Sequence, residues 1–317
     1  MRKFIVSDLH GNGEVYDSIM AYLENIDDQV ELYINGDLID RGYDSFRVLE
    51  DAMERINGKG SIKIHYLGGN HELMMYQALV DRYPGRPIDF HSNWMNYGGW
   101  ATEGGLVDIE DDYEYEQKCE NLKTFLGDLE IYKVFPEMIN KNKLVLVHAQ
   151  VPEDLTKDLR IKDDNKTIED AVWTRKEIRE NLIFGVGDVI GYNRIGKEGY
   201  LAITGHTPAL DSRGFTYNKE ENYFNIDGGC AYYVHGHFDF DHVPLVEVKD
   251  YYLKLLIFNH NNEIVDGYFF DGDLTKLPEC DLERERELIN HDYDNNGLKN
   301  KQLILEILED TKEDIIQ

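Results

Sequence analysis

Three short polar motifs each follow an apolar run, and their residue types are those of a metal site. The apolar runs have the length and the β-branched content of buried strands, so each motif falls at the carboxyl end of a strand, where open α/β sheets place ligands. The runs are Lys3–Val6, Leu32–Asn35 and Ile62–Leu67, and the motifs are Ser7–Gly11, Gly36–Gly42 and Gly69–Glu72. Together the motifs bring carboxylate, imidazole and amide ligands to one edge of the predicted sheet.

Two further histidines extend this ligand set to six residues. His148 follows the run Leu144–Val147, and His206 follows Leu201–Gly205. Two divalent ions need one shared carboxylate, and Asp37 in the central motif is the candidate bridge. We expect Asp8 and His10 to complete one ion, because residues i and i+2 beyond a strand point the same way. The remaining ligands, for the second ion, are Asn70, His148 and His206. Mixed nitrogen and oxygen ligation favours manganese over calcium, with iron or zinc as alternatives.

The same motifs also contain candidate catalytic and phosphate-binding side chains. A pair of ions activates a bridging water for in-line attack on phosphorus, and the leaving oxygen then needs a general acid. His71 is the candidate acid, and Asp40 is the carboxylate expected to hold its tautomer. Arg41 and Arg175, together with Asn70, are the candidate phosphate-binding residues, because a guanidinium matches two phosphate oxygens at once.

Strands alternate with helical patterns up to about residue 71, which predicts βαβ units and a parallel start to a sheet. Helical spacing runs over 13–25, 44–56 and 71–82, and an irregular helical insertion covers about 90–127, with breaks expected at Gly98–Gly99 and Gly104–Gly105. Closely spaced apolar stretches between residues 223 and 270 predict antiparallel strands. We expect an α/β (α+β) fold in which two mixed sheets form a β-sandwich flanked by helices.

The composition excludes some classes of function. The 317 residues carry a formal net charge of −29, which argues against nucleic-acid binding and against docking on anionic membranes. The three cysteines are scattered and form no metal-binding or disulfide pattern, which favours a cytoplasmic location. The first apolar run is too short for a signal peptide, and no stretch has the length of a membrane span. Nothing in the sequence indicates an oligomeric state.

The ordered motifs resemble the signature of the phosphoprotein phosphatase family of calcineurin-like metallophosphoesterases. His148 and Gly205–Pro208 match later metal-binding positions of its bacterial and phage-type serine/threonine phosphatases. Trp173–Arg175 resembles the segment that carries the second phosphate-binding arginine of the family. Ile226–Gly229 resembles the segment that closes the site. The resemblance spans about Phe4 to Gly229. It implies a β-sandwich flanked by helices, two metal ions, often manganese, and phosphomonoester hydrolysis without a phosphoenzyme. We therefore expect a catalytic domain over residues 1–277 and an acidic helical extension over 278–317.

Departures from the family pattern leave alternatives open. Ser7 replaces the usual glycine, and the inhibitor-sensitive segment of eukaryotic members is missing. Diadenosine tetraphosphate hydrolases of the superfamily tend to lack the equivalents of Asp40 and Glu72, so their presence favours phosphoproteins or phosphopeptides as substrates. The alternatives are a hydrolase of dinucleoside tetraphosphates or other small phosphoesters, and a catalytically silent binding protein with a phosphatase fold.

Two other segments contain ligand-type residues that we assign to loops. The segment His235–His242 is rich in histidine and aspartate but follows the strand that closes the site, so we interpret it as a loop near the cleft. Asp292–Gly297 begins like a calcium-binding loop, but its twelfth position is Leu303 instead of a bidentate glutamate. We interpret it as a turn between charged helices.

Overall fold

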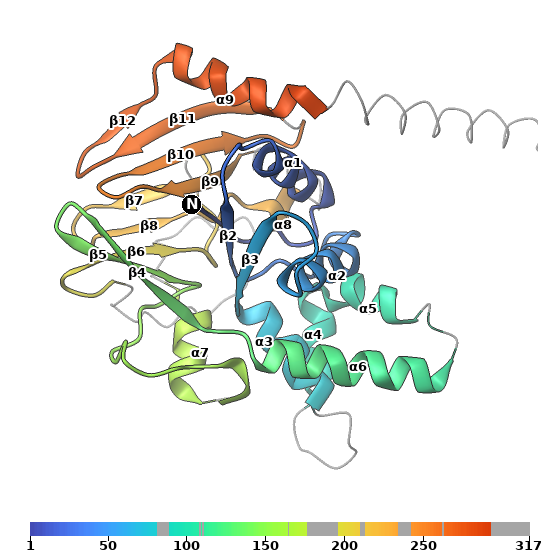
Figure 1. Ribbon diagram of the computed structural model, residues 1–317. Helices are drawn as coiled ribbons and strands as arrows, with labels where there is room; N and C mark the ends of the chain where they lie inside the picture. The colour runs from blue at the N-terminus through green and yellow to red at the C-terminus, as the bar shows by residue number, and fades with distance from the viewer. Residues whose placement is uncertain are drawn as a thin grey trace, which may run out of the picture.

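The computed structural model describes residues 1–80, 89–107, 109, 111–163, 165–175, 196–209, 213–233, 242–261 and 263–292, with the backbone alone for 287–292. Its strands form two mixed sheets with helices outside them (Figure 1). The sequence analysis predicted this arrangement. Among the described helices, none is both long and apolar enough to cross a membrane.

The larger sheet begins with three parallel strands, each followed by a helix. The strands are β1 (Arg2–Val6), β2 (Val30–Asn35) and β3 (Ile62–Leu67), and the helices are α1 (Gly13–Glu24), α2 (Ser45–Ile56) and α3 (Asn70–Val80). The sheet continues from β1 through four antiparallel strands, so its order is β12-β11-β10-β9-β1-β2-β3. These four are β9 (Val243–Val248), β10 (Leu253–Phe258), β11 (Ile264–Phe270) and β12 (Leu274–Lys276).

The smaller sheet has the order β4-β5-β6-β8-β7 and is parallel only at its centre. Its strands are β4 (Tyr132–Ile139), β5 (Asn142–Val147), β6 (Tyr200–Thr204), β7 (Thr216–Asn218) and β8 (Tyr223–Asn225). Two short helices, α7 (Lys166–Trp173) and α8 (Cys230–Tyr233), and a 3-10 turn at Ile161–Asp163 lie in the connections. The antiparallel pairing expected after residue 223 is confirmed for β9, β10 and β11. β8 pairs antiparallel with β7 but also parallel with β6, which was not expected.

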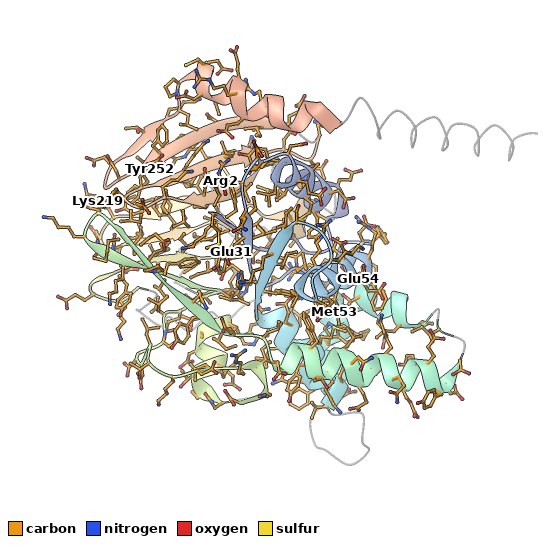
Figure 2. All side chains as sticks on the ribbon, in the orientation of Figure 1. Arg2, Glu31, Met53, Glu54, Lys219 and Tyr252 are labelled. Carbon is orange, nitrogen blue, oxygen red and sulfur yellow. The ribbon has the colours of Figure 1, made fainter. Side chains whose placement is uncertain are left out.

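Successive side chains along each strand point to opposite faces of the sheet, which produces two apolar layers. Ile5 of β1 belongs to the cluster between the sheets, which includes Leu146, Phe224 and Leu255, and side chains fill this space (Figure 2). Its neighbours Phe4 and Val6 belong to the other cluster, which packs the sheet against the helices. Both faces of β1 are therefore buried, as expected for parallel strands that are covered on each side.

The insertion forms a group of helices next to α2 and α3 (Figure 1). It comprises α4 (Phe90–Trp94), a π-helical segment at Met95–Gly99, α5 (Trp100–Val107) and α6 (Asp112–Gly127). Gly98, with φ 101°, interrupts the helix as predicted, but the break expected at Gly104–Gly105 was wrong, because both residues lie inside α5. A side chain at Gly105 would meet the ring of Phe46, so this glycine permits close packing of α5 on α2.

The last described helix, α9 (Glu279–Asp292), packs on α1 and β11 (Figure 1). Leu282 is buried, and Arg286 Nε donates a hydrogen bond to the Ile264 carbonyl. The predicted extension thus begins with a helix that contacts the sheet, and the boundary at residue 278 stays a prediction. Of the calcium-like segment, Asp292 alone lies within the described residues.

Candidate metal centre

Five strand ends meet at one edge of the sandwich and carry the predicted ligands. Asp8 and His10 follow β1, Asp37 follows β2, and His206 follows β6; all four have positive φ, between 47° and 69°. Left-handed backbone at a residue other than glycine costs free energy and persists only when the surroundings hold it in place. The clustering of such residues in these loops shows that the fold maintains strained turns in order to place their side chains.

Glu72 connects the second and third motif loops through a buried carboxylate. Its Oε2 accepts hydrogen bonds from the Asp37 and Gly69 N–H groups, both at 2.8 Å, and its Oε1 accepts from Leu38 N–H at 3.1 Å and Tyr66 Oη at 2.6 Å. The loops also touch directly, because a Cβ at Gly36 would lie 2.6 Å from Gly69 Cα. Glu72 therefore fixes the backbone at Asp37 and Leu38 and holds it against Gly69 of the third motif.

We expect Glu72→Gln to lower the free energy of unfolding by about 1–3 kcal/mol, because the amide group leaves at least one buried N–H donor without an acceptor. Urea unfolding would measure this loss. Glu54→Gln is the matched control, since Glu54 is exposed on α2 and its carboxylate pairs with Lys59 on the surface. An unfolding midpoint for Glu72→Gln equal to that of the control would contradict a role in joining the loops.

Asp37 lies at the centre of the imidazole and carboxylate groups, as predicted for a bridging ligand. Its Oδ2 is 3.6 Å from His10 Nε2 and 3.9 Å from His71 Nε2, and its Oδ1 is 3.4 Å from His148 Nε2. Two groups of donor atoms, each within 4.8 Å of one another, share this carboxylate. They are His10–Asp37–His71 and Asp37–His148–His206.

The other two predicted ligands lie beside these groups. Asn70 Oδ1 is 3.0 Å from His148 Nε2, which places the amide in the second group. The Asp8 carboxylate accepts hydrogen bonds from Ser7 Oγ at 2.5 Å and from the His206 N–H at 2.9 Å, so it connects β1 to the loop after β6. The structure thus brings all six predicted ligands to one edge of the sandwich, although His71, rather than Asp8, shares the first group with His10.

The charges in this centre are those that a pair of divalent cations would balance. Burial alone would raise the pKa of the Asp37 carboxyl, but His148, His71 and His10 hold it well below its usual value. Burial and the neighbouring Asp227 carboxylate raise the pKa of Asp8 well above its usual value. Carboxylates crowded together in a buried site, next to imidazole nitrogens, form a donor set that fits manganese, iron or zinc.

His148 is surrounded by carboxylates and acceptor oxygens. Burial lowers its pKa, but Asp37 and Asp8 outweigh this and raise it to about 10. Both ring nitrogens face acceptors, with Nδ1 2.8 Å from the Asn35 carbonyl and Nε2 3.0 Å from Asn70 Oδ1. A cation bound at Nε2 would displace a proton, while Nδ1–H would keep the ring oriented.

His10 and His206 are poised as neutral ligands. Burial, then the nearby Arg41 and His71, keep the pKa of His10 well below its usual value, and burial and Arg175 do the same for His206. His10 Nδ1 donates to the Ile39 carbonyl at 3.2 Å, which leaves the lone pair of Nε2 directed toward Asp37. Neutral imidazole is the form that binds metal.

The predicted acid, His71, forms a buried pair with Asp40. Its Nδ1 lies 2.7 Å from Asp40 Oδ2, so Nδ1–H donates to the carboxylate, and Arg41 Nη2 donates to Nε2 at 3.2 Å. This tautomer makes Nε2 the atom available to a substrate. Asp40, His71 and Arg41 therefore come together as the sequence predicted.

Arg175, from the segment after α7, lies on the other side of the centre. Its Nε donates to His206 Nε2 at 3.0 Å, and the Trp173 ring lies 6.0 Å from the His206 ring. Tyr97 of the insertion packs edge-on against Trp173 with 5.8 Å between ring centroids. The two predicted arginines thus approach different histidines of the centre, and an aromatic pair lies beside Arg175.

The sequence analysis did not single out Asp227 as an individual site residue. It is buried, its pKa is raised to about 6, first by burial and also by Asp37, and its Oδ1 accepts a hydrogen bond from the Gly229 N–H at 2.8 Å. Its position just after β8 was the available signal, since Asp8 and Asp37 also follow strands. Of the histidine-rich segment 235–242, only His242 lies within the described residues.

Comparison with known families decides the class of the protein. The family model for calcineurin-like phosphoesterases matches residues 1–238, which is most of the chain. The chain belongs to the calcineurin-like phosphoesterase family. In this phosphoesterase the matched range includes every predicted metal ligand, and the donor groups centred on Asp37 are its candidate dimetal site.

Solved structures similar to this phosphoesterase have diverse described activities. A putative diadenosine tetraphosphatase is 17% identical, with 87% of this chain and 93% of that chain covered and a TM-score of 0.45. A cold-active protein-tyrosine phosphatase of a psychrophilic Shewanella is 16% identical (87% and 80%, TM-score 0.43). A protein serine/threonine phosphatase from Saccharomyces cerevisiae is 14% identical (78% and 72%, TM-score 0.46). The search of curated proteins gave no match.

Proposed function

We propose that the protein is a metal-dependent phosphoprotein phosphatase that hydrolyses phosphoserine and phosphothreonine monoesters in the cytoplasm, with manganese as the preferred metal. The observation that carries this proposal is the buried His71–Asp40 pair, with Nδ1 and Oδ2 2.7 Å apart, beside the donor groups that share Asp37. The three cysteines are scattered along the sequence, which fits a reducing compartment.

The side chains of the centre have distinct roles in the proposed reaction. Asp8, His10, Asp37, Asn70, His148 and His206 would hold two divalent ions, which supply an activated water and neutralise phosphoryl oxygens. Arg41, beside His71, and Arg175, beside His206, would bind the remaining phosphoryl oxygens. His71, once protonated at Nε2 in place of its contact with Arg41, would deliver that proton to the leaving oxygen, while Asp40 holds the ring by Nδ1. Alkoxide leaving groups such as serine and threonine need that proton most.

The aromatic pair Tyr97–Trp173 favours a second candidate, hydrolysis of diadenosine tetraphosphate. Tyr97 is 43% exposed and its ring packs on Trp173, whose ring is 6.0 Å from that of His206. Exposed aromatic rings next to a phosphate site can stack on a nucleobase. This candidate uses the same metals, the same acid and the same arginines.

Turnover of each substrate with manganese distinguishes the two candidates. Phosphate release follows hydrolysis of the peptide, whereas the formation of adenine mononucleotides follows hydrolysis of the dinucleotide, because cleavage of its phosphoanhydride chain frees no inorganic phosphate. A phosphothreonine peptide and diadenosine tetraphosphate would be compared at matched concentrations. A higher kcat/KM for the peptide supports the proposal, and a higher value for the dinucleotide transfers it to the second candidate. If no metal among manganese, iron and zinc gives turnover of either substrate, the chain is instead a silent member of the fold.

Arg41→Ala should weaken inhibition by inorganic phosphate about tenfold or more, because a hydrogen bond to a charged group contributes about 1.5–3 kcal/mol. The measurement is the inhibition constant of phosphate at fixed manganese. Arg47→Ala is the matched control, since Arg47 lies nearby in the sequence but its side chain bonds Asp17 and Asp44 on the surface. Equal inhibition constants in wild type and Arg41→Ala would remove Arg41 from the phosphate site.

A further inference from the structure

The Asp40 carboxylate is held by two residues of the helical insertion as well as by His71. Trp94 Nε1 donates to Asp40 Oδ2 at 2.8 Å, and this is the oxygen that also accepts from His71 Nδ1. Thr102 Oγ1 donates to Asp40 Oδ1 at 2.6 Å and accepts from the Asp40 N–H at 3.1 Å. Asp40, Trp94 and Thr102 are each at most 1% exposed. The three donors, His71, Trp94 and Thr102, therefore hydrogen-bond both oxygens of the Asp40 carboxylate.

Thr102 sets the orientation of the carboxylate. Its hydroxyl accepts from the Asp40 backbone and therefore directs its own proton toward the Asp40 side chain. Trp94 then approaches the opposite oxygen from α4. With a donor on each oxygen, rotation of the carboxylate breaks at least one buried hydrogen bond, which is costly where water cannot replace it. The ring of His71 is thereby confined as well.

The insertion also holds the backbone of the adjacent arginine. Arg41 N–H donates to the Gly98 carbonyl at 3.0 Å, and Arg41 Nε is 3.4 Å from the Tyr97 carbonyl. Asp40 and Arg41 both have φ 72°, a conformation that needs support from outside the loop. Gly98 lies in the π-helical segment, where a Cβ would come within 2.7 Å of Arg41 Cγ. Irregular helical turns of this kind occur frequently at functional sites.

We propose that Trp94 and Thr102 are positioning residues for the general acid, so that the insertion at about 90–127 is a structural part of the active site. The inference rests on the proposed function, because it assigns these residues to the His71–Asp40 pair. Both act by holding Asp40, which in turn holds His71 Nδ1.

The test removes each hydrogen-bond donor while conserving side-chain shape as closely as possible. The variants are Trp94→Phe and Thr102→Val, with Thr102→Ser as the conservative rescue. Trp100→Phe and Thr124→Val are matched controls from the same insertion, because Trp100 is 45% exposed and Thr124 Oγ1 bonds only the Glu120 carbonyl of its own helix. Each variant is assayed on a phosphothreonine peptide and on nitrophenyl phosphate, with manganese content measured in parallel.

We expect kcat for the phosphothreonine peptide to fall about tenfold or more in both variants. A general acid that is displaced even slightly from the leaving oxygen transfers its proton much more slowly. The change for nitrophenyl phosphate should stay within about twofold, because its leaving group needs little protonation. Manganese content should be unchanged, Thr102→Ser should recover most of the lost activity, and the controls should match wild type. Equal losses on both substrates, or no loss on either, would overturn the inference.

A second readout does not depend on activity. The Nδ1 proton of His71, assigned in NMR spectra by its disappearance in His71→Asn, should shift in Trp94→Phe and stay in place in Trp100→Phe. If wild type hydrolyses neither substrate, the proposed function fails, while this resonance still tests the positioning role. An unchanged resonance in Trp94→Phe would overturn that role. If Thr102→Val does not fold, Trp94→Phe alone tests the inference.

Discussion

Replacing Asp37 with Asn is expected to abolish phosphate release and to weaken binding at both metal positions. The carboxylate is common to the two donor groups, with His10 and His148 Nε2 at 3.6 and 3.4 Å from its oxygens. Asn preserves the shape but removes the negative charge that both ions would share, and its amide nitrogen cannot bind a cation. The loss in kcat should exceed about 10²-fold, because even one missing transition-state donor costs about 10²–10³-fold.

Metal content and turnover should be measured together to test this prediction. Calorimetric titration with manganese should show both sites weakened in Asp37→Asn. Asp17→Asn serves as the control, because Asp17 is exposed and pairs with Arg47 on the surface. Two tightly bound ions with normal turnover in Asp37→Asn would refute the bridging assignment and, with it, the division of ligands around Asp37.

The parts of the fold that sequence reasoning predicted are those with strong local patterns. The runs before Ser7, Gly36 and Gly68 are largely apolar and have the length of strands, so they predicted β1, β2 and β3 and their parallel order. β4 was not predicted, because it lies at a sheet edge, contains Pro136 and shifts register between Val134 and Met138. β7 and β12 have three residues each, too few for a period to be visible.

The residues of the site divide in the same way, into those that local sequence patterns reveal and those that only the folded structure reveals. Ligands directly after a strand were recognisable, since strand ends converge on one edge whatever the details of packing. Trp94 and Thr102 were not recognisable, because nothing local relates them to Asp40, which is 54 and 62 positions away in the chain. Residues that hold a catalytic group from a separate helix become visible only when the chain is folded.

The geometry around His71 fits two roles, general acid and metal ligand, because its imidazole lies in a donor group with His10 and Asp37. The bond from Nδ1 to Asp40 at 2.7 Å orients the ring so that Nε2 faces Arg41, a predicted phosphate-binding residue, at 3.2 Å. A ligand would instead direct Nε2 at a cation. The two roles make opposite predictions for metal content when the imidazole is removed.

We expect His71→Asn to lower kcat on a phosphothreonine peptide by about 10²–10⁴-fold, the usual contribution of general acid catalysis, with both metals still bound. The loss should be smallest for nitrophenyl phosphate, whose leaving group departs without a proton. His91→Asn is the control, because His91 forms a similar pair with a carboxylate, Glu103, on the exposed side of the insertion at 2.6 Å. Equal losses for good and poor leaving groups would argue against the acid, and loss of one metal would make His71 a ligand.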